Sequence, residues 1–264
     1  MTGLDGLLEW FAGRGRVMVA LSGGVDSALV AYAAHRALGD GAIAVTADYK
    51  TLAQDELADA KRVCSEIGMQ HMLITYDELE NADFVRNDSR RCFYCKTELA
   101  GRMAGLAAEH GVKVIVDGTN LDDLSEYRPG IAAMRDGGIL SPLADAGFRK
   151  EDVRREARLA GISVHDKPSN SCLASRVPWG QRVTAEKLAR IEMGESLVKS
   201  EAGVAQVRVR DMDGAASIEV EPGDVARLSG MLAELDAKLR MIGFKSATVD
   251  PLGYRPGGIN VAAD

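Results

Sequence analysis

The chain has 264 residues, 46% of them hydrophobic and 27% charged, and it carries a net charge of −7 at pH 7. This composition supports a substantial core and excludes a disordered chain, while the acidic balance argues against a general nucleic-acid-binding surface. No run reaches the roughly 20 apolar residues needed to cross a bilayer, and the first residues lack a basic segment followed by an apolar signal core. We therefore expect a cytoplasmic protein without a membrane partner.

The first half of the chain alternates strand-like and helix-like patterns. Residues 17–21 are a continuous apolar run, as in a buried strand, and a helical apolar face begins at Val25. With helices between them, further strands are predicted at residues 42–47, 71–75 and 112–116, and a short fifth one at residues 162–164. Strands that alternate with helices predict a parallel sheet in an α/β fold.

A second, smaller unit is predicted after a loop-like stretch. Residues 166–184 hold two prolines, a glycine and few helix formers, which is typical of a linker or an ordered active-site loop. Beyond it, we predict helices at residues 184–199 and 225–242 and half-buried strands at residues 206–210, 217–221 and 246–250. The chain is thus predicted to form two domains, residues 1–166 with the parallel sheet and residues 167–264 with a small α+β fold.

The segment SGGVDS, residues 22–27, lies at the turn between the first strand and its helix. Its two glycines allow a tight turn that brings backbone N–H groups close to a ligand, and its two serines add hydroxyl donors beside the positive end of the helix. Such donors favour a phosphate. Asp26 would repel a phosphate unless a divalent cation such as Mg²⁺ bridges the two. The alternative is an ordinary glycine-rich turn with a capping serine.

This hexapeptide between a strand and a helix resembles the pyrophosphate-binding loop, or PP-loop, of the N-type ATP pyrophosphatases. That group includes NAD and GMP synthetases and several tRNA thiolases. The resemblance implies an adenine-nucleotide-hydrolase-like fold that cleaves ATP to AMP and pyrophosphate, and the spacings of the Walker and dinucleotide-binding loops do not occur here. The nucleotide-binding residues that we infer are Ala20, Ser22, Gly23, Gly24, Val25, Asp26, Ser27, Ala47, Gly118, Thr119 and Asp122.

Four of these residues, Ala47, Gly118, Thr119 and Asp122, stand at the ends of other predicted strands. In an open α/β sheet, ligands gather at the carboxyl ends of the strands. Ala47 and Asp48 end the second strand, and residues 117–123 (DGTNLDD) follow the fourth. In the PP-loop group the residue after the second strand typically lines the adenine site, and a segment like DGTNLDD closes over the nucleotide. On sequence alone, an ordinary surface turn at residues 117–123 stays open.

Three of the four cysteines stand in motif-like contexts. Cys92 and Cys95 form a CxxC at the start of a predicted helix, and Cys172 lies in the loop-like stretch. A CxxC alone is compatible with a zinc knuckle, a redox pair or part of a cluster site. Cys64 lies on an apolar helical face and is expected to be a core residue, and the histidines show no paired spacing. Three thiolates without an evident fourth ligand suit a 4Fe-4S cluster with one iron open to external sulfide.

Motifs spread over residues 17–210 together resemble the LarE family of sulfur transferases, which make the nickel-pincer nucleotide cofactor of lactate racemase. The matching motifs are SGGVDS (22–27), RCFYCK (91–96), DGTNLDD (117–123), RPG (128–130), SPL (141–143), CLASR with its PWGQRVT tail (172–184) and QVRVR (206–210). The first motif marks only the superfamily, whereas CLASR followed by QVRVR is more specific.

The resemblance implies that the substrate is a pyridinium dicarboxylate mononucleotide. ATP adenylates a carboxylate, a sulfur nucleophile displaces AMP, and a thiocarboxylate remains. In family members with one relevant cysteine, the residue matching Cys172 gives up its own sulfur. Because Cys92 and Cys95 are also present, this chain resembles the three-cysteine branch. We therefore expect Cys92, Cys95 and Cys172 to hold a 4Fe-4S cluster supplied by sulfide or another sulfur donor, with sacrifice of Cys172 as the alternative.

Arginines complete the predicted catalytic set. Arg208 and Arg210 are two apart in a predicted strand and therefore point to the same face, a pattern suited to a substrate phosphate or carboxylate. Arg176 follows Cys172 by four residues in the same loop. With Cys172 and Asp26, these three arginines are the predicted catalytic residues. A solvated strand edge is the alternative for the first two.

Other functions stay open. A cluster-dependent tRNA thiolase would require a basic surface and an RNA-binding module, and this acidic chain shows neither. An amide-forming synthetase has no use for the cysteine motifs. A non-catalytic nucleotide-binding sensor with a structural zinc is the alternative from a different class, and metal analysis would separate it from a cluster enzyme. We expect a homo-oligomer that binds small molecules and no nucleic acid.

Overall fold

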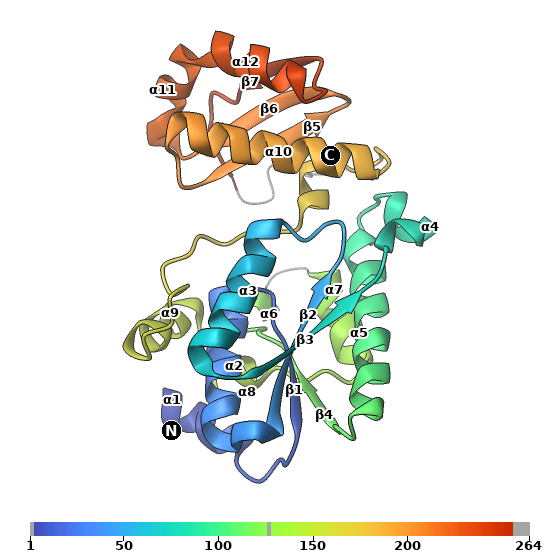
Figure 1. Ribbon diagram of the computed structural model, residues 1–264, viewed down its shortest axis with the longest axis vertical. Helices are drawn as coiled ribbons and strands as arrows, with labels where there is room; N and C mark the ends of the chain where they lie inside the picture. Colours follow the sequence, from blue (N-terminus) through green and yellow to red (C-terminus); the bar gives the residue numbers. More distant parts are fainter. Residues whose placement is uncertain (1–2, 126–127, 256–264) are drawn as a thin grey trace. The chain divides into compact units, whose positions relative to one another are not determined.

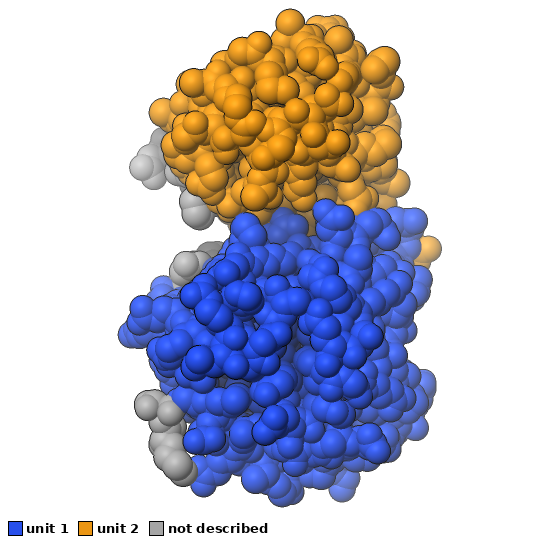
Figure 2. Space-filling view, turned by 60° about the vertical axis from the view of Figure 1, so that its left-hand side comes forward, with its two compact units in different colours: residues 1–77, 92–170 blue, residues 78–91, 171–264 orange. Residues whose placement is uncertain are grey.

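The computed structural model describes residues 3–125 and 128–255. The chain divides into two compact units: unit 1 comprises residues 1–77 and 92–170, and unit 2 comprises residues 78–91 and 171–264 (Figure 2). The short segment 78–91 therefore belongs to the second unit, although it lies within the first half of the sequence. The functions predicted for residues 1–166 and 167–264 stay predictions.

Unit 1 is built on a four-stranded parallel sheet with the order β3-β2-β1-β4 (Figure 1). The strands are β1 (Val17–Ala20), β2 (Ala42–Asp48), β3 (Gln70–Thr75) and β4 (Val114–Val116). The helices are α1 (Leu4–Phe11), α2 (Val25–Leu38), α3 (Gln54–Ile67), α5 (Arg91–Glu109), α6 (Leu121–Leu124), α7 (Pro129–Asp136), α8 (Pro142–Asp145) and α9 (Lys150–Leu159). The predicted α/β fold with a parallel sheet is confirmed.

The predicted fifth strand at residues 162–164 is wrong. The N–H of Ile162 donates to the carbonyl oxygen of Ala157 at 2.9 Å, so this segment is part of the turn that ends α9. Ile162 and Val164 are buried in the hydrophobic core of unit 1. Their apolar character reflects packing of a turn and not membership of the sheet.

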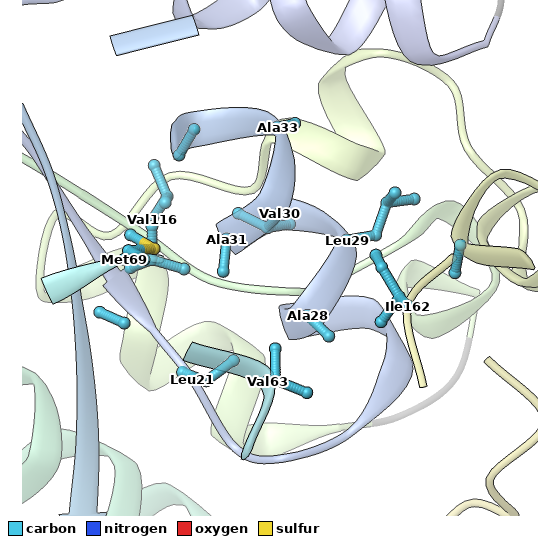
Figure 3. Close-up of a cluster of buried hydrophobic side chains, with 14 of the residues drawn as sticks. Leu21, Ala28, Leu29, Val30, Ala31, Ala33, Val63, Met69, Val116 and Ile162 are labelled. Carbon is cyan, nitrogen blue, oxygen red and sulfur yellow. The ribbon is translucent and has the colours of Figure 1, made fainter. Parts of the chain in front are cut away.

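Helices cover both faces of the sheet because the strands are apolar on both. Val17 and Val19 of β1 pack into a cluster formed with α1, α2, α3 and α9, whereas Met18 packs into a second cluster formed mainly with α5. Figure 3 shows part of the first cluster, with side chains of α2 among Leu21, Val63 and Ile162. Because the strands are parallel, the carboxyl ends of β1, β2 and β4 lie at the same end of the sheet. The predicted loops begin there.

Unit 2 contains a three-stranded sheet with the order β5-β6-β7, antiparallel between the first two strands and parallel between the last two. Its elements are β5 (Val207–Met212), β6 (Ala215–Val220), β7 (Ser246–Val249), α4 (Ala82–Val85), α10 (Ala185–Ala202), α11 (Val225–Gly230) and α12 (Leu232–Met241). The predicted small α+β fold is confirmed, but the single helix predicted at residues 225–242 is wrong in one respect. It is divided into α11 and α12 at Met231.

Among the described residues, no helix combines the length and the apolar character that spanning a membrane would require.

Candidate functional site

Residues 22–27 form the turn between β1 and α2, with Val25 as the first residue of the helix. The hydroxyl oxygen of Ser27 accepts from the N–H of Ser22 at 3.1 Å and donates to the carbonyl oxygen of Gly24 at 3.1 Å. The hydroxyl oxygens of Ser22 and Ser27 are also 3.1 Å apart. These hydrogen bonds of Ser22 and Ser27 stabilise the turn. Because the first N–H groups of a helix lack intrahelical acceptors, this turn offers donors to an anion.

Two glycines of the predicted site cannot be replaced without a collision. Gly23 has φ +81°, and a Cβ atom there would collide with the carbonyl oxygen of Glu56 in α3. A Cβ atom on Gly118 would lie 2.6 Å from the backbone nitrogen of Ser27. The loop after β4 thus packs directly against the start of α2, and the two predicted loops come together in unit 1.

Asp117 organises the loop after β4. Its carboxylate accepts hydrogen bonds from the N–H and the hydroxyl of Thr119, at 3.0 and 2.9 Å, and from the hydroxyl of Ser141 at 2.9 Å. Burial raises the pKa of Asp117, and these hydrogen bonds and the charge of Lys96 oppose that effect. The DGTNLDD and SPL motifs are therefore one structural assembly, and Lys96 of the RCFYCK motif lies near it.

Asp26 lies where the two loops meet. Its Oδ1 accepts a hydrogen bond from Nδ2 of Asn120 at 3.2 Å, and its Oδ2 forms an ion pair with Nζ of Lys150. Asn120 comes from the loop after β4, and Lys150 is the first residue of α9. One carboxylate therefore connects three segments of unit 1.

Lys150 was not predicted from the sequence. Cations are unfavourable at a helix N-terminus because that end of the helix dipole is itself positive. Arg149 and Lys150 nevertheless stand at the start of α9, where Asp122 compensates them: its carboxylate accepts from Nη1 of Arg149 at 2.9 Å and from the N–H of Lys150 at 2.8 Å. Two cations in an unfavourable position are the sequence signal that could have identified this contact.

Asp26 is also the side chain of the phosphate loop that could hold Mg²⁺. Its side chain is 22% exposed, so an ion can reach it. One carboxylate together with phosphate oxygens is a common donor set for Mg²⁺. Within residues 3–125 and 128–255, no three His, Cys, Asp or Glu side chains are grouped as a metal site. The donor set therefore fits a Mg²⁺ ion that arrives with the phosphates of ATP.

An apolar wall adjoins the carboxyl ends of the central strands. Ala20 of β1 and Ala47 of β2 belong to the cluster that α5 covers, and Ala47 is buried. Tyr49 and Tyr76, which follow β2 and β3, belong to the same cluster, and their ring centroids are 5.4 Å apart. Such a wall is chemically suited to a planar base. The tyrosines were not predicted, although aromatic residues directly after two strands could have marked them.

Cys92 and Cys95 lie at the start of α5, in unit 1. Residues three apart on a helix share a face. Cys92 is exposed and Cys95 is buried. A Cβ atom on Gly130 would lie 3.4 Å from the carbonyl oxygen of Cys92 and 3.0 Å from Cγ of Lys96, so the RPG motif packs against the CxxC turn.

Cys172 lies in unit 2, directly before the 3-10 turn Leu173–Arg176, and is half-buried. The guanidinium of Arg176 is fully buried: Nη1 donates to the carbonyl oxygens of Ser171 and Cys172, at 2.5 and 3.1 Å. Its Nε and Nη2 donate to the two carboxylate oxygens of Glu195 in α10, at 2.8 and 3.2 Å. In this arrangement Arg176 shapes the loop that carries Cys172.

Arg208 and Arg210 lie on β5 and are 4% and 5% exposed, which excludes a solvated strand edge. Nη2 of Arg210 donates to Glu219 at 2.7 Å, and Nη1 donates to the carbonyl oxygen of Ser175 at 2.9 Å. The pair therefore lies beside the Cys172 loop within unit 2.

The surroundings of Arg208 disfavour its positive charge. Burial, and next the charge of Arg176, lower the pKa of Arg208. Its guanidinium carbon lies 5.2 Å from the ring centroid of Tyr254, and Nη1 donates to the carbonyl oxygen of Val207 at 2.8 Å. The charges of Glu195 and Tyr254 act in the opposite direction and partly offset this effect.

The segment 78–91 also contacts the loop that follows Cys172, within unit 2. Asn87 is buried with φ 59°, and its Nδ2 donates to three backbone carbonyl oxygens between residues 177 and 181. Nη1 of Arg91 donates to Oδ1 of Asn87 and to the carbonyl oxygen of Ala174, both at 2.7 Å. The residue before Cys92 is thus bound to the loop that follows Cys172, a contact that the sequence did not indicate.

Residues 12–124 match the family model described as asparagine synthase. This range contains the SGGVDS turn, the CxxC and the DGTNLDD loop.

Several relatives match almost the whole chain. An uncharacterized protein of Synechocystis is 39% identical over 259 residues, which cover 97% of this chain and 96% of that protein. Pyridinium-3,5-bisthiocarboxylic acid mononucleotide synthase of Lactiplantibacillus plantarum is 31% identical over 246 residues, 93% of this chain and 89% of the synthase. NH(3)-dependent NAD(+) synthetase of Chlorobaculum tepidum is 37% identical over 168 residues, but these cover only 61% of this chain and 59% of the synthetase.

Proposed function

Because the chain belongs to the LarE family of pyridinium-3,5-bisthiocarboxylic acid mononucleotide synthases and is an ATP-dependent enzyme, we propose that it converts the carboxylates of a pyridinium dicarboxylate mononucleotide into thiocarboxylates. The product would serve the nickel-pincer cofactor of lactate racemase. The observation that carries this proposal is the contact of Asp26 in the PP-loop with Asn120 and Lys150. This contact supports the proposal because the turn would bind the phosphates, Asp26 would hold Mg²⁺ and Lys150 would supply a cation.

The proposed reaction has two steps for each carboxylate. A carboxylate oxygen of the substrate attacks the α-phosphorus of ATP, and pyrophosphate leaves with the electrons of the broken P–O bond. A sulfur nucleophile then attacks the carbonyl carbon of the acyl adenylate, and AMP leaves. With hydrogen sulfide ion as the nucleophile, the products are a thiocarboxylate, AMP and a proton.

The PP-loop would bind and orient ATP. Its backbone N–H groups and the hydroxyls of Ser22 and Ser27 would hold the pyrophosphate portion, and Asp26 would hold Mg²⁺ against it. Mg²⁺ at Asp26 would free the ammonium of Lys150 to pair with phosphate oxygens. The adenine would lie at Ala20 and Ala47, and Gly118, Thr119 and Asp122 would close the loop over the nucleotide.

Arg208 and Arg210 would bind a phosphate or carboxylate of the pyridinium substrate. A buried pair of guanidiniums on one strand, β5, suits a planar, bidentate anion, and this burial supports the proposal. Arg176 would keep the Cys172 loop in shape through the contacts described above.

We also propose that Cys92, Cys95 and Cys172 hold a 4Fe-4S cluster, which would supply replaceable sulfide when bound. Thiolates are the usual ligands of such a cluster, and three thiols are available. In the described residues, no three His, Cys, Asp or Glu side chains are grouped so that they could hold a metal ion. Two of the cysteines belong to unit 1 and one to unit 2.

The proposal includes the predicted partners and location. The substrate and the sulfur donor are small molecules, and the net charge of −7 supports the absence of a nucleic-acid partner. A cytoplasmic homo-oligomer stays a prediction.

Anaerobically purified protein given MgATP, sulfide and the pyridinium dicarboxylate mononucleotide tests this function. We expect AMP, pyrophosphate and a product in which sulfur has replaced carboxylate oxygen, detected by mass spectrometry. Asp26→Asn should reduce all three products roughly a hundredfold, because it removes the charge that holds Mg²⁺. Formation of ADP and phosphate would contradict the assignment.

A further inference from the structure

Lys167 ties the linker before Cys172 to the PP-loop. Its Nζ donates to the carbonyl oxygen of Gly23 at 3.2 Å. The same ammonium pairs with Glu56 and Asp59 of α3 at 2.7 and 2.5 Å, and the side chain is 18% exposed. All four residues belong to unit 1. The roles proposed above do not use this contact.

We propose that Lys167 is a positioning residue for the phosphates of ATP. By holding the carbonyl oxygen of Gly23, it fixes the peptide between Gly23 and Gly24 with the N–H of Gly24 turned toward the anion. This proposal rests on ATP binding at the PP-loop, as in the proposed function, and it does not depend on the identity of the sulfur acceptor.

Peptide geometry links the two groups. In a trans peptide the carbonyl of one residue and the N–H of the next point in opposite directions. Lys167 therefore determines the direction of the Gly24 N–H by binding the carbonyl of Gly23. In the structure this N–H points to Oγ of Ser22 at a long distance of 3.4 Å, an interaction that a phosphate oxygen can replace.

Because residue 23 is a glycine, the orientation of its peptide needs the contact with Lys167. Gly23 has φ +81°, and without a Cβ atom its peptide can rotate between orientations that other residues avoid. The reversed orientation would point a carbonyl oxygen at the phosphate, which is repulsive. An ammonium bound to that oxygen excludes the reversed orientation.

The surrounding charges keep the ammonium in place. Arg62 also pairs with Asp59, at 2.8 Å, and Nδ2 of Asn170 donates to Glu56 at 2.8 Å. Both carboxylates that bind Lys167 are therefore themselves held by a second group. The position of the ammonium is therefore set by carboxylates of α3.

The main chain of Lys167 is anchored as well. Arg154 of α9 donates to the carbonyl oxygens of His165 and Lys167, at 3.2 and 2.9 Å. Helix α9 also carries Lys150, the partner of Asp26. The linker that continues to Cys172 is thus fixed to the same elements that shape the phosphate loop.

Binding of magnesium pyrophosphate and of AMP, each measured by titration calorimetry, tests this proposal. Lys167→Met should weaken pyrophosphate binding about tenfold, the effect expected for one misaligned hydrogen bond to a charged group, and should change AMP binding less than about twofold. Lys167→Arg should restore pyrophosphate binding, because it keeps a cation that can donate to Gly23. Lys113→Met is the matched control, an exposed lysine of unit 1, and should leave both affinities unchanged.

Unchanged pyrophosphate binding in Lys167→Met would overturn the proposal, as would an equal loss of AMP and pyrophosphate binding. Lys167→Gln provides the same comparison if the methionine variant does not fold. A wild-type protein that binds no pyrophosphate would overturn both this role and the proposed function. The selective loss with rescue by arginine, in a protein that forms no thiocarboxylate, would support this role and reject the proposed function alone.

Discussion

Nδ2 of Asn120 donates a hydrogen bond to the carboxylate of Asp26 at 3.2 Å, across 94 positions of the sequence. The orientation of this amide is fixed, because its oxygen accepts from the N–H groups of Asp122 and Asp123 at the start of α6, at 2.9 and 3.2 Å. With the oxygen occupied, the NH₂ group faces Asp26. A helix cap therefore orients the amide that donates to Asp26, the carboxylate proposed to hold Mg²⁺.

This relationship predicts the effect of Asn120→Asp. An aspartate keeps the helix cap but places a second carboxylate against Asp26, so ATP turnover should fall roughly tenfold to a hundredfold while Tm changes little. Steady-state release of pyrophosphate measures the effect. Asn81→Asp is the matched control, since Asn81 caps α4 with the same two backbone contacts and lies in unit 2. Equal activity of the two variants would show that the contact with Asp26 has no role in ATP turnover.

Gly118→Ala should impair both folding stability and ATP binding. The new Cβ atom would lie 2.6 Å from the backbone nitrogen of Ser27, so either the loop after β4 or the start of α2 must move. Thermal unfolding and calorimetric titration with MgATP measure the two effects. Gly101→Ala in α5 meets nothing within 4 Å and should raise stability by about 0.5–1 kcal/mol, because alanine favours a helix. A normal ATP affinity in Gly118→Ala would contradict the close packing of the two loops.

Much of the fold and the main loops could be predicted from the sequence because their signals are local. The SGGVDS turn depends on two glycines between an apolar strand and a helix, and that pattern lies within a few residues. The contact of Lys150 with Asp26 joins positions 124 apart, so no local pattern contains it. The strand predicted at residues 162–164 failed because a buried turn has the same apolar composition as a short strand.

The site in unit 2 was only partly predictable. Alternation in QVRVR predicts that Arg208 and Arg210 share a face, and the structure adds that both are buried. Spacing gave no indication that Arg176 would be fully buried and bound to Glu195, because that contact depends on how α10 packs. The insertion of residues 78–91 into unit 2 is likewise a tertiary feature without a local sequence signal.

Arg208→Lys and Arg210→Lys should raise the KM for the pyridinium mononucleotide about tenfold and leave the KM for ATP nearly unchanged. Lysine keeps the charge but loses the planar pair of donors that binds a phosphate or carboxylate. Initial rates at varied concentrations of each substrate separate the two constants. Arg240→Lys, on the exposed side of α12, is the control. If the KM for ATP rises as much as the KM for the pyridinium substrate, the arginines act on the triphosphate instead.

Stability should decrease in acid because of His71. Thr46 donates its hydroxyl hydrogen to the carbonyl oxygen of Leu21 and therefore accepts from Nε2 of His71, both at 2.8 Å. Burial, and next the charge of Lys61, lower the pKa of His71 from 6.5. A lowered pKa means that the folded protein binds the proton less well than the unfolded chain, so the free energy of unfolding falls as the pH drops below about 6.5.

Denaturant unfolding of the wild type and of His71→Gln, on both sides of that pH, measures this contribution. Glutamine can still donate to Thr46 but does not titrate. As the pH falls, the free energy of unfolding of the wild type should therefore decrease more than that of His71→Gln. A difference that stays constant with pH would show that His71 titrates equally in the folded and unfolded states.

Alanine variants of the cysteines distinguish a replaceable sulfide donor from the sacrifice of Cys172. If Cys92, Cys95 and Cys172 hold a cluster, alanine at any of the three should remove iron, acid-labile sulfide and thiolation together. Burial raises the pKa of the Cys64 thiol to about 12, so it is inert and makes the control. Cys64→Ala should keep full activity and lose only some packing stability.

Tracing isotopically labelled sulfide tests the central claim most directly. Cluster-loaded protein is given MgATP, the pyridinium dicarboxylate mononucleotide and labelled sulfide without oxygen, and both the product and the intact protein are analysed by mass spectrometry. The account predicts labelled thiocarboxylate over many turnovers, one AMP for each sulfur transferred, and an unchanged protein mass. Unlabelled product formed once per protein, with loss of hydrogen sulfide at Cys172, would contradict the cluster-borne donor, and AMP formation without any sulfur in the product would contradict sulfur transfer itself.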